Sequence, residues 1–143
     1  MYEGLKHAHS GLRWVVLILL ILAITGAYRS WKGGAAGSKM PLYAMISVHV
    51  QLLLGLGLYF ISPYVKFTEG FMKDPVLRFY SVEHLSLMLL AILTITIGYS
   101  RAKRKPTDAA RGRTTFMYYA IALVLILLAI PWPFRQGLGA GWF

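Results

Sequence analysis

Four long apolar runs, separated by short polar stretches, constrain this chain more than any other feature. A helix that crosses the apolar layer of a bilayer, roughly 30 Å thick, needs about 20 residues at about 1.5 Å each. Runs of that length lie at about residues 9–28, 41–64, 79–100 and 114–133. We therefore predict a single all-α transmembrane domain over residues 1–143, an integral membrane four-helix bundle with up-down-up-down topology.

The composition agrees with a membrane protein, since 57% of the residues are hydrophobic and only 14% are charged. The absence of cysteine excludes thiolate metal sites, iron–sulfur clusters and covalently attached c-type haem. Lys6 followed by an apolar run resembles a secretory signal, but the stretch Thr25–Gly26–Ala27 is a poor cleavage site. We interpret the first run as a retained helix.

Basic residues predict both the partner and the orientation of the chain. The net charge is +10, and the basic residues lie between the apolar runs, which favours lipid headgroups over nucleic acid as their partner. Loops 29–40 and 101–113 hold nine Lys and Arg, against five on the opposite side when Arg13 is counted as intramembrane. The positive-inside rule then predicts cytoplasmic loops and both termini on the periplasmic side of a bacterial inner membrane.

Ionisable side chains inside a membrane are costly and usually functional. The predicted spans contain His9, Arg13, His49, Glu83 and His84. Measured from the span midpoints, His9 and His84 lie toward the same outer leaflet, with depths that differ by about 6 Å. His49 lies deeper, about 13 Å from the level of His84.

Haem b suits this arrangement, because two histidines on different helices of a bundle can bind one haem iron from both faces. We expect His84 to be one axial ligand. The second is His9, favoured by depth, or His49, favoured by its apolar surroundings, and of the two we favour His9. Arg13 follows His9 by one helical turn and so faces the same way, where it can meet a haem propionate.

Simpler interpretations stand beside these. Each histidine can be only an interfacial or interhelical polar side chain. Arg13 and Glu83 are expected to pair with each other across the first and third helices. Gly55 and Gly57 indicate close helix packing or space for a flat cofactor. The stretch 137–141 (GLGAG) follows no strand, so we interpret it as a flexible tail rather than a nucleotide-binding loop.

Four segments have a distinctive sequence, namely 7–14 (HAHSGLRW), 49–56 (HVQLLLGL), 78–84 (RFYSVEH) and 131–135 (PWPFR). Together they resemble a family of small four-span bacterial inner-membrane proteins labelled "cytochrome b-like". The resemblance covers nearly the whole chain and implies one haem b, with electron exchange with quinone or a respiratory partner. Unlike larger di-haem cytochromes b, the chain lacks two histidines on one helix about a dozen residues apart.

Three functional interpretations follow. The first is a haem-b electron-transfer protein, or a small subunit of a respiratory or quinone-linked complex, with His49 as a quinone or haem-edge contact. The second is a haem-free accessory subunit that packs against other membrane protein subunits. The third is a proton or ion pathway lined by His49, Glu83 and His84. The colour of the purified protein separates the first interpretation from the second.

Overall fold

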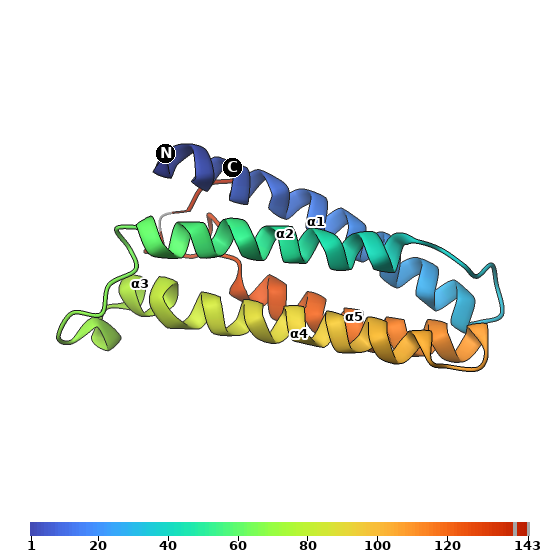
Figure 1. Ribbon diagram of the computed structural model, residues 1–143. Helices are drawn as coiled ribbons and strands as arrows, with labels where there is room; N and C mark the ends of the chain where they lie inside the picture. Colours follow the sequence, from blue (N-terminus) through green and yellow to red (C-terminus); the bar gives the residue numbers. More distant parts are fainter. Residues whose placement is uncertain (139, 143) are drawn as a thin grey trace.

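The structure is a computed structural model that describes residues 1–138 and 140–142. The chain folds into an all-helical bundle (Figure 1). Its long helices over these residues are α1 (Tyr2–Trp31), α2 (Met40–Ile61), α4 (His84–Lys103) and α5 (Asp108–Ala129). A 3-10 turn η1 (Phe71–Lys73), the short helix α3 (Pro75–Arg78) and a π-helical turn η2 (Phe79–Glu83) lie between α2 and α4. The predicted all-α class and four-helix bundle are confirmed.

Length and hydropathy make these helices suitable for a membrane. Within the described residues, four helical stretches are long and apolar enough to cross one, namely Tyr2–Trp31, Met40–Ile61, Pro75–Lys103 and Asp108–Ala129. The third stretch is continuous through α3, η2 and α4. Large apolar side chains such as Ile18, Leu53 and Leu93 point outward and are exposed, as lipid-facing residues are. The fold is thus consistent with a multi-pass membrane protein.

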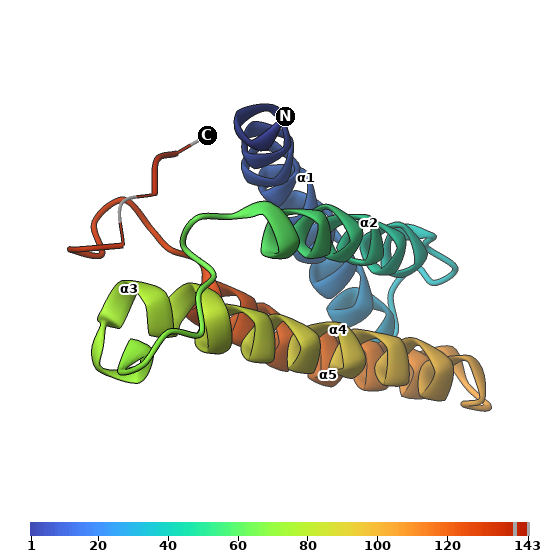
Figure 2. The ribbon, with the colours of Figure 1, turned by 60° about the vertical axis from the view of Figure 1, so that its left-hand side comes forward.

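Packing between the helices is uneven. Helix α1 packs along α2 and α5, and α4 packs along α5, whereas α2 and α4 meet over a much shorter stretch. Figure 2 shows the α1–α2 pair crossing over the α4–α5 pair. Leu20, Ile95 and Tyr119 are fully buried in the core between them. The helices therefore pack tightly around α5, and the contact between α2 and α4 is the weakest between neighbouring long helices of the bundle.

Two glycines explain the close packing near the α4–α5 connection. A Cβ on Gly112 of α5 would lie 2.6 Å from the backbone oxygen of Ala27 in α1. A Cβ on Gly98 of α4 would overlap the side chain of Tyr118 in α5. Only glycine lets the backbones approach this closely, so these positions hold α1, α4 and α5 together.

Helices α1 and α5 begin several residues before the predicted spans, and charged residues lie in the additional turns. Helix α1 begins at Tyr2 rather than His9, and Glu3 and Lys6 form an ion pair within its first turns. Helix α5 begins at Asp108 rather than 114, and the Thr107 side chain caps it by accepting from the Ala110 N–H at 3.1 Å. A count of apolar residues detects the part of a helix suited to lipid and misses its polar ends.

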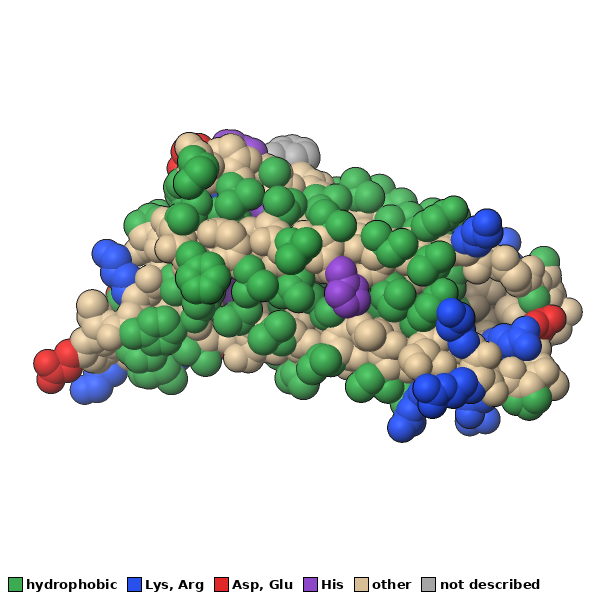
Figure 3. Space-filling view, viewed as in Figure 1, with side chains coloured by type: hydrophobic (Ala, Val, Ile, Leu, Met, Phe, Trp, Pro, Cys, Tyr) green, Lys and Arg blue, Asp and Glu red, His purple; other side chains and the backbone are tan. Residues whose placement is uncertain are grey.

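Both termini lie at one end of the bundle, and the α1–α2 and α4–α5 loops lie at the other (Figure 1). The alternating directions of α1, α2, α4 and α5 give the predicted up-down-up-down arrangement. Lys and Arg side chains gather at the loop end, as Figure 3 shows. We call the two ends the terminal end and the loop end.

Candidate cofactor site

A cavity of about 430 Å³ lies at the terminal end of the bundle. Its walls come from α1, α2, the start of α4, the end of α5 and the segment after α5. The walls are mainly apolar and include Val16, Val48, Leu52, Met88 and Ile126. Cofactor pockets typically have volumes of about 300–1,000 Å³ and apolar walls with a few polar groups, and this cavity fits that description.

His9 and His84 face each other in this cavity. His9 comes from α1 and His84 is the first residue of α4, and both line the cavity. Their ring centroids are 6.2 Å apart, and the ring planes make an angle of 69°. The structure therefore brings together the histidine pair that the depth estimate favours.

A backbone hydrogen bond fixes the orientation of the His84 ring. His84 Nδ1 lies 2.8 Å from the carbonyl oxygen of Ala129 in α5. A carbonyl oxygen only accepts, so Nδ1 carries the proton and Nε2 keeps its lone pair. Metal-binding histidines are usually oriented in this way, with the second ring nitrogen donating to a carbonyl or carboxylate.

The π-helical turn η2 sets the position of His84. Within η2, the Ser81 carbonyl accepts a hydrogen bond from the Tyr59 hydroxyl of α2 at 2.8 Å. The wider turn also stacks Glu83 above Arg78, which donates to it at 2.7 Å. Single π turns occur often at functional sites. This turn was not predicted, because residues 79–83 (FYSVE) are compatible with a continuous α-helix.

Arg13 lies beside the cavity and is only 8% exposed. It donates to the backbone oxygen of Trp142 at 2.6 Å, and its guanidinium lies 5.2 Å from the Trp14 ring and 5.8 Å from the Trp132 ring. The expected Arg13–Glu83 pair is wrong, since Glu83 pairs with Arg78 instead. Among the described residues, no carboxylate forms an ion pair with Arg13.

Buried polar atoms without a partner collect around this cavity. Within the described residues these atoms are His9 Nδ1, Arg13 Nε and Gln51 Oε1, and all three residues line the cavity. The other end of the Gln51 amide donates to the His9 backbone oxygen at 2.7 Å. Buried polar groups are costly when unpaired, so such a cluster indicates that a polar ligand belongs here.

Gly55 of α2 gives the His9 ring its space. A Cβ on Gly55 would lie 3.1 Å from His9 Cε1, closer than side chains normally pack. Gly57 plays a different part, because a Cβ there would meet a methyl group of Leu5 at 3.1 Å. Gly55 therefore belongs to the site, and Gly57 belongs to the packing of α1 on α2.

His49 does not join the cavity. It lies on the exposed side of α2, and its Nδ1 lies 2.7 Å from the Met45 carbonyl oxygen. Its Nε2 is 3.5 Å from the Thr96 hydroxyl of α4, and His49 is not among the cavity-lining residues. The structure thus separates His49 from His84 and from Glu83, so these three residues do not line one path.

The segment after α5 also contributes to the site, which the sequence analysis did not foresee. Leu138, Ala140 and Gly141 line the cavity, and the Tyr80 hydroxyl donates to the Leu138 carbonyl at 2.8 Å. The stretch 137–141 was expected to be a flexible tail; its described residues fold back over the cavity, and residue 139 lies outside them. A sequence pattern cannot reveal such backbone contacts.

The residues present fit a haem. No group of three or more His, Cys, Asp or Glu side chains able to hold a bare metal ion lies within the described residues. Haem brings its own ring nitrogens and takes only axial ligands from the protein. Two imidazoles bound to one metal at about 2 Å have ring centroids roughly 6 Å apart. The observed separation of 6.2 Å agrees with this arrangement.

Comparisons of the chain with protein families, with characterised proteins and with solved structures find no match. The structure itself defines the protein as a four-helix bundle with a cofactor-sized cavity at one end.

Proposed function

We propose that this protein is a membrane-embedded haem-b electron-transfer protein, or a small subunit of a respiratory or quinone-linked complex. His9 and His84 would bind the haem iron, and the cavity at the terminal end would hold one haem. The facing imidazole rings of α1 and α4, 6.2 Å apart in a cavity with apolar walls, are the observation that carries the proposal.

The surrounding side chains support this assignment. The Ala129 carbonyl holds the His84 ring with Nε2 free to bind a metal. Arg13 lines the cavity and supplies positive charge for the propionates, while Lys6 also lines the cavity but forms an ion pair with Glu3. The unpartnered Nε of Arg13 is one donor that remains available. The site thus offers two ligands, apolar walls and a cationic partner.

A bound haem supplies reversible one-electron transfer. This chain's residues would bind it, exclude water from its faces and neutralise its acid groups. The loops at the far end of the bundle are short, so electrons would be exchanged with quinone or with another membrane protein subunit rather than with a large domain inserted in this chain.

The proposed location is a bacterial inner membrane with both termini periplasmic. Support comes from the nine Lys and Arg at the loop end against five at the terminal end. Reporter fusions test the orientation. Fusions at residues 35 and 107 are expected to report the cytoplasm, and periplasmic activity at both positions would reverse the proposal.

The haem assignment is tested on the purified protein in detergent. The expected result is a Soret band, sharp reduced α and β bands, and about one haem per chain by pyridine haemochrome assay. His9→Ala and His84→Ala are expected to lose the haem or convert it to high spin. His49→Ala is the matched control, because it removes an imidazole outside the cavity, and it should remain low spin.

Two results would contradict the proposal. One is a low-spin spectrum that survives His84→Ala. The other is a helical, monodisperse protein that stays colourless after haem is added to it, which would favour the haem-free accessory subunit. Circular dichroism on each variant separates loss of haem from loss of fold.

A further inference from the structure

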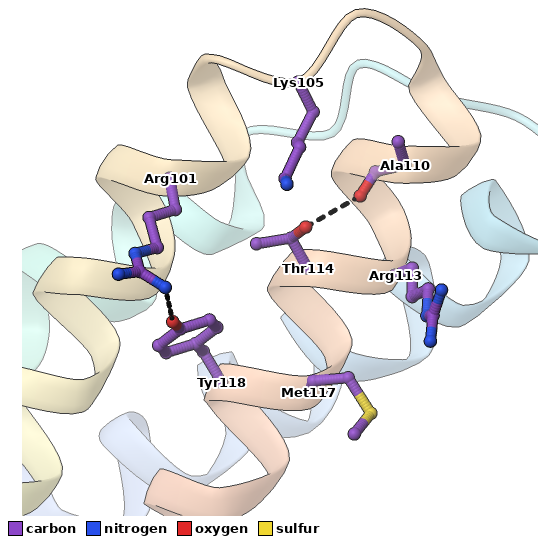
Figure 4. A pocket seen from close by; sticks show the side chains of 7 residues that line it. All are labelled: Arg101, Lys105, Ala110, Arg113, Thr114, Met117 and Tyr118. Carbon is purple, nitrogen blue, oxygen red and sulfur yellow. Dashed lines mark hydrogen bonds between the residues drawn. The ribbon is translucent and has the colours of Figure 1, made fainter.

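A second pocket, of about 290 Å³, lies at the loop end between α4 and α5. Figure 4 shows Arg101 and Lys105 on the α4 side, with Arg113, Thr114 and Tyr118 on α5. Met117 and Ala110 complete its lining. This pocket is at the opposite end of the bundle from the histidines, so it has a separate role.

The pocket concentrates positive charge that no acid neutralises. Arg101, Lys105 and Arg113 are all exposed, and none has an ion-pair partner among the described residues. Asp108, the acidic residue of this loop, pairs with Arg111 at 2.8 Å. Arg101 and Lys105 lie on one side of the pocket and Arg113 lies on the other side of α5, so the open surface between them carries unpaired positive charge along both edges (Figure 4). Such a surface attracts an anion, and arginine favours phosphate in particular.

Neighbouring aromatic groups hold the two guanidinium groups without using all their donors. Arg101 Nη1 donates to the Tyr118 hydroxyl at 2.7 Å. The Arg113 guanidinium lies 5.9 Å from the Trp31 ring of α1. An arginine has five N–H donors, so both side chains retain donors for a ligand while their positions are restrained.

Apolar surface continues from this pocket along both helices. On α5, Met117, Ile121, Val124 and Leu128 are exposed at a spacing of three or four residues, which places them on one face. On α4, Ile97 and Leu93 continue the face of Arg101 in the same direction. A cationic pocket above an exposed apolar face matches a molecule with an anionic head and hydrocarbon chains.

We propose that this pocket binds the phosphate of an anionic phospholipid, whose acyl chains lie along the exposed faces of α4 and α5. Basic pockets between membrane helices are known to bind anionic lipid headgroups. The proposal requires only that the bundle lies in a membrane and does not depend on haem. Free phosphate shares the charge but not the chains, so the apolar faces favour the lipid.

Native mass spectrometry of the delipidated protein in detergent tests the proposal. With phosphatidylglycerol added, we expect a discrete one-lipid adduct, and with phosphatidylcholine we expect at least tenfold weaker retention. Arg113→Gln and Lys105→Gln should each weaken phosphatidylglycerol binding about tenfold, as loss of a charge-assisted contact does. Both side chains are exposed, so the fold should survive either change.

Arg104→Gln is the matched control, because it removes one positive charge from the same loop at a residue outside the pocket lining. It should leave the adduct unchanged. Equal weakening by Arg104→Gln would show general charge attraction and overturn the proposal. So would equal retention of phosphatidylcholine, or displacement of the lipid by millimolar inorganic phosphate or glycerol phosphate, which would indicate a site for a soluble anion.

Discussion

The two ends of the bundle differ in how closely their helices pack. At the loop end, Gly112 lets the backbones of α5 and α1 come into close contact, and Gly98 makes room in α4 for the Tyr118 side chain of α5. At the terminal end, the same helices leave a cavity of about 430 Å³ that holds two facing histidines. The close packing is made from small residues, whereas the open end has mainly apolar walls with a few buried polar groups such as His9, Arg13 and Gln51.

This difference indicates how a small bundle of apolar helices can hold a cavity. Helices in lipid gain little from the hydrophobic effect and associate through close packing and hydrogen bonds. The glycine contacts at the loop end supply that packing, while at the terminal end individual hydrogen bonds to Ala129, Ser81 and Trp142 hold the structure. Stability and site therefore depend on different residues, which mutations can separate.

The largest effect is expected at the loop end, from Gly112→Ala. The new Cβ would lie 2.6 Å from backbone atoms of Ala27 and Trp31, which cannot turn aside. We expect a loss of about 3 kcal/mol in unfolding free energy, the upper range for overpacking. Thermal unfolding in detergent, followed by circular dichroism, measures it.

Gly11→Ala is the control for this change. Gly11 also lies in a helix, but a Cβ there meets nothing within 4 Å. Its replacement should be neutral or stabilising by up to about 1 kcal/mol, because alanine favours helix. Equal losses of unfolding free energy for Gly112→Ala and Gly11→Ala would mean that the loop end is not stabilised by close packing at Gly112.

An intermediate effect is expected at the terminal end, from Arg13→Met. This change removes the hydrogen bond to Trp142 and the contacts with the Trp14 and Trp132 rings. We expect a loss of about 2 kcal/mol, together with faster proteolysis of the segment after Pro133. The exposed Arg29, on the same helix at the loop end, gives the control Arg29→Met. If proteolysis after Pro133 does not change, Arg13 does not hold this segment.

The smallest effect on stability, below about 1 kcal/mol, is expected from Gly55→Ala, since the His9 ring needs to move by only tenths of an ångström. If haem is bound as proposed, the midpoint potential or the low-spin spectrum should shift. Gly57→Ala introduces a contact of the same 3.1 Å, but with Leu5, and should not alter either quantity. Identical spectra for both variants would show that Gly55 does not influence the surroundings of the haem ligand His9.

Much of the fold could be predicted from the sequence because apolar runs of sufficient length have few alternatives in lipid. The depth estimate also placed His9 near the level of His84, and the structure brings their rings to within 6.2 Å of each other. It could do so because depth along a helix follows from counting residues.

The direction of a side chain around its helix could not be predicted as well. In a regular α-helix Arg78 and Glu83 would lie about 140° apart, which left Glu83 free to be assigned to Arg13. The π turn η2 brings Arg78 and Glu83 onto one face and pairs them at 2.7 Å. His49, the alternative ligand suggested by its apolar neighbours, lies on the exposed side of α2 and outside the cavity lining, because those neighbours face outward as well as toward the core.

The π turn also decides which changes of length this segment can tolerate. Its hydrogen bonds join residue i to i+5 and enclose one residue more than those of an α-helix. Deleting a single residue from Phe79–Glu83 would therefore restore a regular helix and leave His84 on nearly the same side of it. The same deletion within the regular helix α4 would turn every later residue by about 100° relative to His84. Homologous chains that keep the histidine pair can therefore lack one residue in this turn, but not in the helix that follows it.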